Sequence, residues 1–453
     1  MKRRRLSEVA EIVSGRLVGE DEIVSSAVVD SRIAVPDSLF FAVSGSRADG
    51  HTFVGDALAR GATAAVVTRH DGTGGPVVVV KDVVAALTSL ARIERLGTAA
   101  KVVGVTGSTG KTTTKDLAAA VLGSRFRVSA SPASFNNEIG LPLTILAADE
   151  QTEIIVCELG SRGLGHITRL CETARPDVGV VTNVGIAHME LFGSFENIVD
   201  SKAELVECLT EAGTAVLFAD DPVVLGYSER TAAKVLTFGR APGASVKAED
   251  VALSVRGTAS FELVFEGTRE RVELGVPGEH MVANALAAAA TGVVFGVPPA
   301  RAAQALGDVR VSPWRMEVCR GPGGVVVIND AYNANPMSMA AALKTARWIA
   351  RRGRMAAVLG AMAELGPVSF EEHKRLGKLV ARLGIERLIT VGDAARPVAD
   401  AAIRGGVEAE NVASYDDPGR ALKDVRAWAR EGDVVLFKAS RIAGLEKLAE
   451  AMR

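Results

Sequence analysis

The stretch VVGVTGSTGKTTT at residues 102–114 combines three local patterns in one order. Its apolar start predicts a buried strand over residues 102–106, and its glycine-rich middle predicts a tight loop over residues 107–110, after which a helix is expected to begin at Lys111. Glycines let a backbone approach a ligand closely, so amide groups of such a loop and of the helix N-terminus can point at phosphate oxygens. The stretch therefore predicts a phosphate-binding loop rather than a glycine turn without a ligand, although Val105 stands where the pattern GxxxxGK(S/T) has its first glycine.

This loop is expected to hold the phosphates of ATP. Lys111 would bring its ammonium group to the β- and γ-phosphates, and the hydroxyl of Thr112 would bind Mg²⁺. The remaining nucleotide contacts of the loop are assigned to Gly107, Ser108, Thr109, Gly110 and Thr113. These residues alone indicate an enzyme that depends on a magnesium nucleotide.

Two further polar side chains follow apolar strands near the loop. Glu158 comes where the apolar run of residues 154–157 stops, and a carboxylate there can hold Mg²⁺ or its water. A lone glutamate at such a place is more often a helix cap or a surface charge, and the neighbouring phosphate loop is what favours a ligand. His188 follows the apolar run 178–181 in a similar way, but a lone histidine is usually structural, so the residues alone leave its role open.

The whole chain divides into three tracts, so the expected fold is α/β with three domains. Short β-rich runs alternate with small helices over residues 1–98, which predicts a small mixed α/β domain. The alternation over residues 99–312 predicts a central phosphate-loop domain with a parallel sheet and crossover helices, extended by antiparallel strands at residues 246–276. Strands and helices alternate again over residues 313–453, which predicts a Rossmann-like, doubly wound domain.

The composition excludes several classes of protein. A chain of 453 residues is too long for one hydrophobic core. Aromatic residues make up only 4% and the formal net charge is −2, which argues against a stacking platform for single-stranded nucleic acid and against attraction to nucleic acid or anionic lipid. The four cysteines show no CxxC pair and fit reduced thiols. We therefore expect a cytoplasmic protein that binds no nucleic acid.

Two segments share features with a signal peptide or a membrane span. Residues 2–5 are basic, but no apolar core follows them, and we expect instead a short surface helix with Ser7 as its cap. Residues 281–300 carry no charge and could span a bilayer. They consist mostly of Ala and Gly, contain Asn284 and end in two prolines, so we expect a buried helix and no membrane insertion.

The motifs together resemble those of a known family, the Mur ligases of peptidoglycan synthesis. The run GVTGSTGKTTTKD at residues 104–116 is similar to the phosphate loop of that family, including its departure from the general pattern. Further similar motifs are SFNNEIGLP at residues 134–142, TNVGIAH at 182–188, NDAYNANP at 329–336, LGAMAELG at 359–366 and FKASR at 437–441. They cover nearly the whole chain and are most similar to the branch that adds D-alanyl-D-alanine. The Asp-Asn-Pro-Arg run of the branch that adds diaminopimelate or lysine is absent from the sequence.

The resemblance implies a reaction with ATP and Mg²⁺. ATP would phosphorylate the terminal carboxylate of UDP-N-acetylmuramoyl-tripeptide, and the amine of D-alanyl-D-alanine would then attack the acyl phosphate and release phosphate. The domain of residues 1–98 would bind the UDP end, that of residues 99–312 would bind ATP, and that of residues 313–453 would complete the ligase site. The implied partners are these two small-molecule substrates, and we expect a monomer.

The resemblance also assigns the catalytic and metal-binding residues. Lys111, Glu158, His188 and Lys202 would be catalytic, with Thr112 and Glu158 holding a first Mg²⁺ and His188 a second. Lys202 matches a lysine that the family carbamylates, and its carbamate would bind Mg²⁺ and orient the acyl phosphate. Without the resemblance, Lys202 would be an ordinary lysine on a helix surface, paired with a nearby glutamate.

The nucleotide and substrate residues follow in the same way. Asn284 would contact the adenine and Asp330 the ribose, and Arg315 and Asn333 would add nucleotide contacts from the third domain. Met281 stands where relatives usually have Asn, so Asn284 is the amide that we assign. The substrate contacts are assigned to Ser31, Arg32, Asp49, His51, Asn136 and Asn137. For the two turns at residues 30–32 and 49–51, ordinary loop capping is the alternative.

Two other functions remain to be weighed against this one. A related ligase could add a different amino acid or extend folate with glutamate, although the Asn136-Asn137 and Tyr332-Asn333 motifs argue against it. A nucleotide-gated binding protein could use the phosphate loop as a switch. The dependence of ATP hydrolysis on the co-substrates distinguishes a switch from a ligase. A switch hydrolyses ATP without an amino acceptor, whereas a ligase requires both co-substrates.

Overall fold

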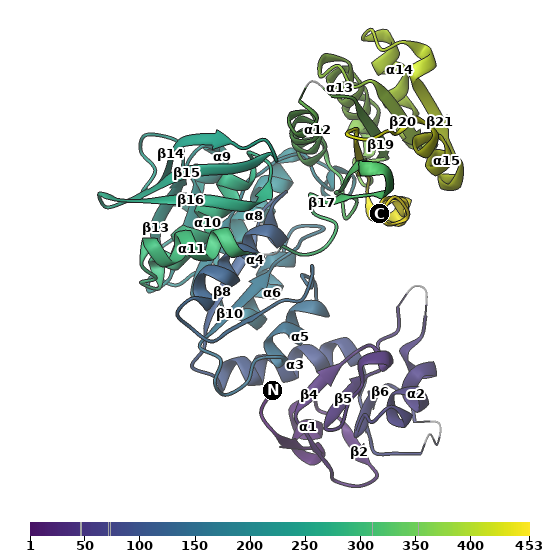
Figure 1. Cartoon of the computed structure of the whole chain (residues 1–453). Helices are drawn as coiled ribbons and strands as arrows, with labels where there is room; N and C mark the ends of the chain where they lie inside the picture. The colour runs from purple at the N-terminus through teal and green to yellow at the C-terminus, as the bar shows by residue number, and fades with distance from the viewer. Residues whose placement is uncertain (46–47, 71, 73, 310, 352) are drawn as a thin grey trace.

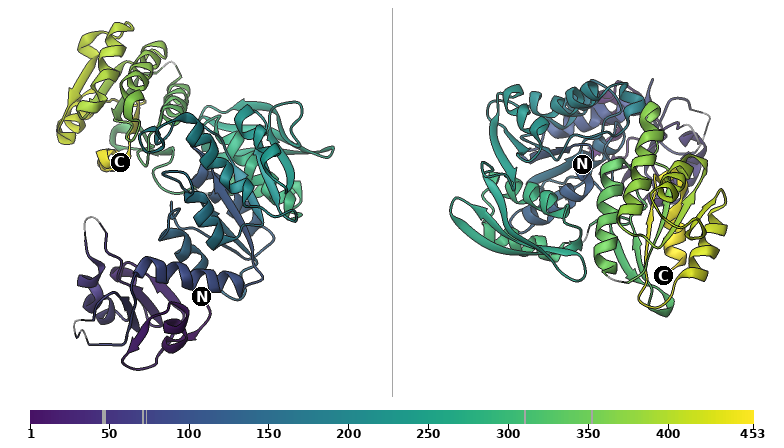
Figure 2. Two further views of the ribbon diagram at one scale, coloured as in Figure 1. Left: turned by 180° about the vertical axis from the view of Figure 1, so that it is seen from behind. Right: turned by 90° about the horizontal axis from the view of Figure 1, so that it is seen from above.

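The computed structural model describes residues 1–45, 48–70, 72, 74–309, 311–351 and 353–453. The chain forms three lobes in sequence order, coloured purple, blue to green, and green to yellow in Figure 1. The lobes are built on sheets of five, nine and six strands. The views in Figure 2 agree that the middle lobe joins the two outer lobes. This is the three-part α/β architecture predicted from the sequence.

The N-terminal lobe holds a five-stranded sheet with the order β2-β7-β6-β5-β4, in which only the β2–β7 pair is antiparallel. Its strands are β2 (Arg16–Val18), β4 (Ser26–Val28), β5 (Ser38–Phe41), β6 (Ala64–Val67) and β7 (Val77–Val79). Strands β1 (Arg4–Arg5) and β3 (Ile23–Val24) form a separate pair. The helices are α1 (Leu6–Ile12), α2 (Val54–Ala59) and α3 (Val83–Leu96), with 3-10 turns η1 (Ser31–Ile33) and η2 (Gly50–Phe53).

The first helix begins differently from the prediction. Its N-cap is Arg5, which makes no side-chain capping bond, and Ser7 lies inside the helix. The amide and the hydroxyl of Ser7 donate hydrogen bonds of 2.8 and 2.9 Å to the carboxylate of Asp21. The assignment of Ser7 as the cap was therefore wrong, because a carboxylate distant in sequence satisfies the first turn.

The middle lobe holds a nine-stranded sheet with the order β16-β15-β14-β13-β12-β11-β8-β10-β9. Neighbours from β9 to β14 run parallel, and β14, β15 and β16 add the antiparallel extension predicted at residues 246–276. The strands are β8 (Lys101–Thr106), β9 (Val128–Ala130), β10 (Ile154–Glu158), β11 (Val178–Val181), β12 (Thr214–Phe218), β13 (Lys234–Gly239), β14 (Val246–Leu253), β15 (Thr258–Phe265) and β16 (Thr268–Pro277). The helices are α4 (Lys111–Gly123), α5 (Gly140–Leu146), α6 (His166–Ala174), α7 (Met189–Phe192), α8 (Phe195–Glu207), α9 (Pro222–Gly226), α10 (Met281–Val294) and α11 (Pro299–Asp308), with the 3-10 turn η3 (Tyr227–Arg230).

Residues 281–300 are helical and largely buried, as predicted, but they do not form one helix. α10 ends at Val294, and a second helix, α11, begins at Pro299. Pro298 precedes that start, and a proline and the residue before it disfavour a continuous helix. Helix α10 packs against α4, which follows the phosphate loop. Within the described part of the chain, no helix is long and apolar enough to cross a membrane.

The C-terminal lobe holds a six-stranded sheet with the order β17-β18-β22-β19-β20-β21, parallel except for the β17–β18 pair. Its strands are β17 (Glu317–Arg320), β18 (Val326–Asn329), β19 (Met355–Gly360), β20 (Arg387–Val391), β21 (Val412–Tyr415) and β22 (Val434–Lys438). The helices are α12 (Pro336–Ala350), α13 (Ser369–Arg382), α14 (Arg396–Arg404), α15 (Pro418–Trp428) and α16 (Leu445–Ala451). Five 3-10 turns complete it: η4 (Pro322–Gly324), η5 (Gly366–Val368), η6 (Asp393–Ala395), η7 (Ala409–Asn411) and η8 (Arg441–Ala443). The edge strands β17 and β21 are short and partly exposed, and the sequence pattern did not indicate them.

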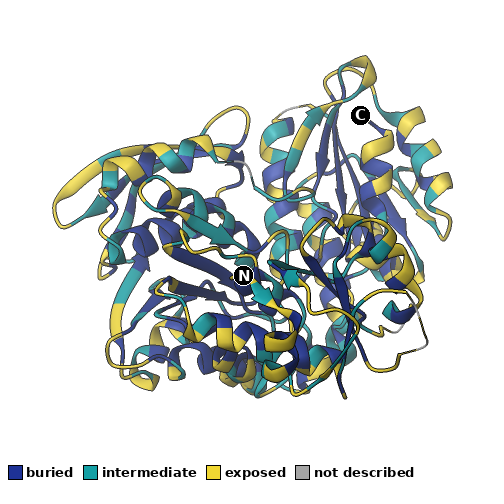
Figure 3. Cartoon of the chain, turned by 90° about the horizontal axis from the view of Figure 1, so that it is seen from below, coloured by how far each residue is buried: buried dark blue, intermediate teal, exposed yellow. Residues whose placement is uncertain are grey.

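The sheet beneath the phosphate loop is packed tightly against α8. Figure 3 shows that buried residues concentrate in the strands and on the inner helix faces. Leu205 of α8 is fully buried, and a Cβ at Gly179 of β11 would lie only 3.1 Å from its Cγ. Leu205 also lies against Gly104 of β8, so one side chain fills the space over two strands that end at the site.

We predict that Leu205→Ala lowers the free energy of unfolding by about 2–5 kcal/mol, because it leaves a cavity under the phosphate loop. Urea unfolding followed by circular dichroism measures the change. Leu96→Ala is the matched control, since Leu96 is 60% exposed at the end of α3 and its loss should cost less than about 0.5 kcal/mol. Equal effects of the two substitutions would contradict this account of the packing.

Candidate functional site

The phosphate loop runs from β8 to α4, in the strand-loop-helix order predicted from the sequence. Gly107 has a φ of 142° and Gly110 a φ of 79°, in the left-handed region that favours glycine. A Cβ at Gly107 would overlap the hydroxyl of Thr182, and a Cβ at Gly110 would overlap Oδ1 of Asn284. Both glycines are therefore required by backbone conformation and by close neighbours.

The loop after β11 braces the phosphate loop from the side. Oδ1 of Asn183 accepts hydrogen bonds from the amide and hydroxyl of Thr109 at 2.9 and 3.1 Å, and its Nδ2 donates to the Thr109 carbonyl at 3.1 Å. The hydroxyl of Thr182 donates to the same carbonyl at 2.6 Å. Strands β8 and β11 are neighbours in the sheet, which brings the two loops together. Thr182 and Asn183 belong to a motif noted in the sequence, but no role in the site was assigned to them.

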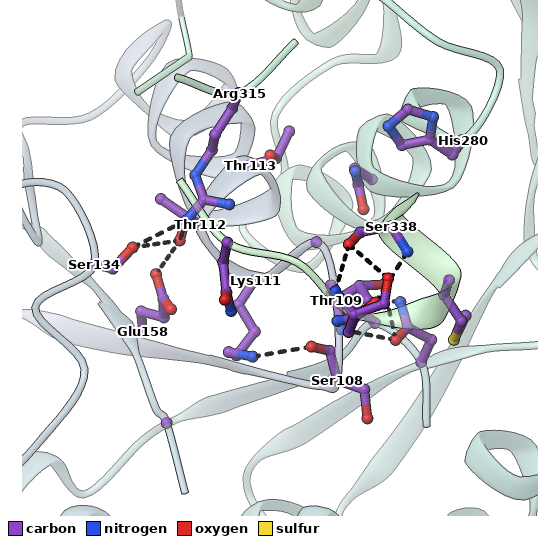
Figure 4. A pocket seen from close by; sticks show the side chains of 18 of the residues that line it. Ser108, Thr109, Lys111, Thr112, Thr113, Ser134, Glu158, His280, Arg315 and Ser338 are labelled. Atoms are coloured by element: carbon purple, nitrogen blue, oxygen red, sulfur yellow. Dashed lines mark hydrogen bonds between the residues drawn. The ribbon is translucent and has the colours of Figure 1, made fainter. Parts of the chain in front are cut away.

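The ammonium group of Lys111 folds back over the loop (Figure 4). Its Nζ donates to the carbonyls of Gly107 at 2.6 Å and of Ser108 at 3.4 Å. Burial lowers the pKa of Lys111, while the nearby carboxylate of Glu158 opposes that shift. A phosphate group in the loop could replace these carbonyls as the partner of the ammonium, which is a compact point charge.

Thr112, Ser134, Glu158 and Arg315 meet beside the loop (Figure 4). The hydroxyl of Thr112 donates to Oε2 of Glu158 at 2.6 Å, and Nη2 of Arg315 donates to the hydroxyl oxygens of Thr112 at 2.7 Å and Ser134 at 3.0 Å. Glu158 reaches the loop because β10 pairs in parallel with β8 and places it opposite Val105. Arg315 arrives from the start of the C-terminal lobe, so this cluster joins two lobes.

The oxygen atoms of Thr112, Ser134 and Glu158 in this cluster are suited to bind Mg²⁺. They are two hydroxyl oxygens and one carboxylate, which are hard ligands of the kind that Mg²⁺ prefers, and both hydroxyls already accept hydrogen bonds from the positively charged Arg315. Among the residues that the structure describes, no group of three or more His, Cys, Asp or Glu side chains is placed to hold a metal. Mg²⁺ in this place would therefore take several ligands from water and phosphate, as it commonly does.

His188 lies where the middle and C-terminal lobes touch. It precedes α7 with a φ of 56°, and its Nδ1 is hydrogen-bonded to the carboxylate of Glu364, in the loop after β19. Burial and the nearby ammonium of Lys111 lower the pKa of His188, and Glu364 opposes that shift. With Nδ1 facing Glu364, Nε2 is the ring nitrogen left for another ligand.

Lys202 is buried in α8, with 3% of its surface exposed. Its Nζ donates to the hydroxyl of Ser161 at 2.6 Å, and burial lowers its pKa well below the usual range. The nearby carboxylate of Glu204 instead accepts hydrogen bonds of 2.6 and 2.9 Å from the amides of Gly165 and Thr168 at the start of α6. The alternative of a surface lysine paired with a glutamate was therefore wrong, because α8 turns this face inward.

A cavity of about 1270 Å³ joins these groups. The predicted residues that line it are Ser108, Thr109, Gly110, Lys111, Thr112, Thr113, Asn136, Asn137, Glu158, His188, Lys202, Asn284, Arg315, Asp330 and Asn333. Gly107 is outside this lining but shapes the loop. The N-terminal residues Ser31, Arg32, Asp49 and His51 do not line the cavity.

The side of the cavity formed by the C-terminal lobe contains a partly buried ion pair that the sequence did not reveal. Oδ2 of Asp330 accepts a hydrogen bond of 2.6 Å from Nζ of Lys438, and its Oδ1 accepts one of 3.0 Å from the amide of Met316. Lys438 also donates to the carbonyl of Asn333 at 3.0 Å. The sequence feature that could have indicated Lys438 is its position at the end of the apolar run that forms β22, inside the motif at residues 437–441.

The two asparagines predicted to bind substrate differ in their contacts. Nδ2 of Asn136 donates to Oε1 of Glu158 at 2.8 Å, so it holds the carboxylate oxygen that Thr112 does not. Oδ1 of Asn137 accepts from the amide of Gly140 at 2.9 Å, at the start of α5. Asn136 thus holds the carboxylate of Glu158 in its cluster with Thr112, and Asn137 stabilises the start of α5.

The two N-terminal turns show the contacts expected of capping. The side chains of Asp30 and Asp49 accept from the amides of Arg32 and His51 and cap η1 and η2. Hydrogen bonding from Arg32 lowers the pKa of Asp30 to about 2. The hydroxyl of Ser31 donates to the carboxylate of Asp56 at 2.8 Å. Each turn is therefore closed by hydrogen bonds to its own aspartate, and Arg32 remains exposed.

Three family models match consecutive parts of the chain. "Mur ligase family, catalytic domain" matches residues 24–103, "Mur ligase middle domain" matches residues 105–292, and "Mur ligase, glutamate ligase domain" matches residues 314–441. Together they span most of the sequence, in the order of the three lobes.

Individual relatives of the chain are also Mur ligases. The chain is 39% identical to the UDP-N-acetylmuramoyl-tripeptide--D-alanyl-D-alanine ligase of Mycobacterium tuberculosis, over 99% of this chain and 97% of that one. The structure of MurF ligase from Thermotoga maritima in complex with ADP matches with a TM-score of 0.80 at 31% identity, covering 95% and 97% of the two chains. The structure of UDP-N-acetylmuramoylalanyl-D-glutamyl-2,6-diaminopimelate--D-alanyl-D-alanyl ligase from Acinetobacter baumannii matches with a TM-score of 0.85 at 26% identity, covering 100% and 98%. The chain therefore belongs to the Mur ligase family.

Proposed function

We propose that this chain is an ATP-dependent amide ligase that adds D-alanyl-D-alanine to UDP-N-acetylmuramoyl-tripeptide in peptidoglycan precursor synthesis. The observation that carries the proposal is the cavity in which the phosphate loop, Glu158 and the buried Lys202 line one space. It occurs in a chain that is 39% identical, over 99% of its length, to a ligase of that name. We also propose that the protein is a cytoplasmic monomer and that its substrates are small and nucleotide-linked.

The first step of such a reaction places a substrate carboxylate next to the triphosphate of ATP. Two anions approach each other, so the site must supply positive charge at the transferred phosphoryl group. Lys111 is positioned to do so from the phosphate loop, and Thr112 and Glu158 would hold Mg²⁺, with His188 as a ligand of a second ion. Mg²⁺ would neutralise phosphate charge and orient the reacting oxygens. The carboxylate then attacks the γ-phosphorus, ADP leaves, and an acyl phosphate remains.

Lys202 is suited to carbamylation. The neutral amine attacks carbon dioxide, an N–C bond forms, and the nitrogen loses a proton to give an anionic carbamate. Burial favours the neutral amine that this step needs, and its hydrogen-bonding partner, Ser161, is uncharged. The carbamate would place a carboxylate-like group in the cavity, where it could bind Mg²⁺ and orient the acyl phosphate.

The C-terminal lobe is proposed to close on the nucleotide. Arg315 already donates to the hydroxyl of Thr112, which is the proposed ligand of Mg²⁺, so the two cations compete for one oxygen. Binding of the magnesium nucleotide would move the guanidinium from Thr112 to a phosphate oxygen. Asp330 and Asn333 would reach the ribose side, and Asn284 the adenine.

We propose one role for each domain. The UDP end would bind to residues 1–98, ATP would bind to residues 99–312, and the ligase site would be completed by residues 313–453. Arg32 is exposed and close to Ser31, so this turn could hold a pyrophosphate if the pair with Asp30 opened. Asp49 and His51 would support a second turn at that site. Asn136 and Asn137 would face the substrate between the domains.

The proposed function is tested by phosphate release from ATP in the presence of UDP-N-acetylmuramoyl-tripeptide and different acceptors. We expect release that depends on both co-substrates and is fast only with D-alanyl-D-alanine. Equal rates with free D-alanine would exclude the dipeptide assignment. Release without any acceptor would favour the nucleotide-gated switch.

Lys111→Ala is expected to reduce kcat by at least about 10²-fold, because it removes charge stabilisation from phosphoryl transfer. Steady-state phosphate release measures the loss. Lys423→Ala is the matched control, since Lys423 is exposed on α15 and does not line the cavity. A Lys111 variant that kept the kcat of the control would contradict the assigned role.

Lys202→Ala should lose activity that added acetate or formate restores in part, because a small carboxylate can occupy the space of the missing carbamate. The measurement is the rate of phosphate release against carboxylate concentration, with chloride at equal ionic strength as the reference. The same additions should not rescue Lys111→Ala. A folded Lys202→Ala protein that no carboxylate rescues would count against the carbamate.

ATP and UDP-substrate together are expected to make the chain more compact, because the proposed nucleotide ligands come from two lobes. Small-angle X-ray scattering measures the radius of gyration with and without the ligands. The variant Arg315→Ala should close less completely at equal nucleotide occupancy. An unchanged radius in the ligand-saturated wild-type protein would refute the closure.

A further inference from the structure

One part of the cavity lining has no role in the reaction described so far. We call it the peptide arm and define it by Leu141, Pro142, Arg162, His166, Arg169 and Leu170, all of which line the cavity. Arg162 directly follows Ser161, which also lines the cavity and whose hydroxyl accepts the hydrogen bond from Lys202. The arm therefore adjoins the proposed site of acyl phosphate formation.

The chain that carries the arm is anchored to α8 at two points. Lys202 binds Ser161, and Glu204, two residues further on, binds the amides of Gly165 and Thr168. Arg162 lies between these anchors and directly follows Ser161, so its backbone is fixed next to the catalytic lysine. The loop is also closed internally, because the amide of Arg162 donates to Nδ1 of the following helix residue, His166, at 3.3 Å.

Helical periodicity places further residues of the arm on one face of α6. His166, Arg169 and Leu170 are three and four residues apart and line the same cavity. Leu141 and Pro142 of α5 also line the cavity, but both are buried. The groups of the arm that a ligand can reach are therefore the cationic and imidazole side chains of Arg162, His166 and Arg169, which we call its rim.

The two arginines of this rim are not neutralised by the protein. Arg162 and Arg169 are exposed, and within the described residues neither forms an ion pair. Glu138 also lines the cavity but pairs with neither of them. By contrast, Arg60, which is also exposed, pairs with Asp56. Guanidinium groups left without a partner beside a substrate channel suit the carboxylates of an anionic ligand.

We propose that the peptide arm binds the acidic peptide of the UDP-substrate, and that Arg162 selects a third residue whose side chain carries a carboxylate. This inference rests on the proposed function. A third residue such as diaminopimelate, named in the substrate of the Acinetobacter baumannii ligase, keeps one carboxylate after the other is activated. Its distal carboxylate suits Arg162. Lysine ends in the same ammonium group as the distal end of diaminopimelate but lacks the carboxylate, so it offers Arg162 no partner.

The test compares kcat/KM for two UDP-N-acetylmuramoyl-tripeptides that differ only in the third residue, diaminopimelate or lysine. We expect the wild-type protein to prefer diaminopimelate, and Arg162→Gln to lower that preference roughly tenfold, mostly through KM. Arg162→Lys should retain part of the preference, because it keeps the charge but loses the planar fork. Arg175→Gln is the matched control, since Arg175 is exposed at the end of α6 and outside the cavity lining.

The outcomes separate this inference from the proposed function. Activity with both tripeptides and no preference between them, or an equal loss for both in Arg162→Gln, would overturn the selectivity and leave the ligase function in place. No D-alanyl-D-alanine-dependent phosphate release with either tripeptide would overturn the ligase function itself.

Discussion

The contact between Glu158, Thr112 and Arg315 is the constraint on which the site depends. The hydroxyl of Thr112 donates directly to the carboxylate of Glu158, and Arg315 of the C-terminal lobe donates to the same hydroxyl. The parallel pairing of β8 and β10 sets the carboxylate beside the loop, and Asn136 fixes its second oxygen. Arg315 adds a positive charge to the cluster. We propose that Mg²⁺ takes the same oxygens when the nucleotide binds and that Arg315 then moves to a phosphate oxygen.

The groups around this contact are held by loops at the ends of parallel strands. The loop after β11 braces the phosphate loop, and the carboxylate of Glu364 reaches His188 from the loop after β19. Parallel strands bring their carboxyl ends to one edge of a sheet, so ligands gather there. Helix α8 adds Lys202 and Glu204, which bind Ser161 and Gly165 on either side of Arg162 and so connect the proposed catalytic centre to the peptide arm.

Features encoded within a few residues could be predicted from the sequence. The strand, loop and helix around Gly107 and Gly110 follow from local composition, and so does the emergence of Glu158 where an apolar run stops. The burial of Lys202 could not be predicted without the family resemblance, because residue 202 lies on a helix whose packing partners are distant in sequence. The bond between Arg315 and Thr112 depends on how two lobes meet, which no local pattern records. Strands β9, β17 and β21 were missed because they are short and lie at sheet edges, where the apolar signal is weak. Strand β13 lies inside its sheet, but its first two residues are exposed and the next two only partly buried, which weakens the pattern of a buried strand.

The acyl phosphate intermediate is tested most directly by following an oxygen atom of the substrate's terminal carboxylate. UDP-N-acetylmuramoyl-tripeptide labelled with ¹⁸O in its terminal carboxylate is converted with ATP and D-alanyl-D-alanine, and the released phosphate is examined by mass spectrometry. An acyl phosphate formed in the site transfers one labelled oxygen to each phosphate, and this is the expected result. Phosphate without the label, in a reaction that forms the amide, would contradict the chemistry assigned to Lys111, Glu158 and Lys202.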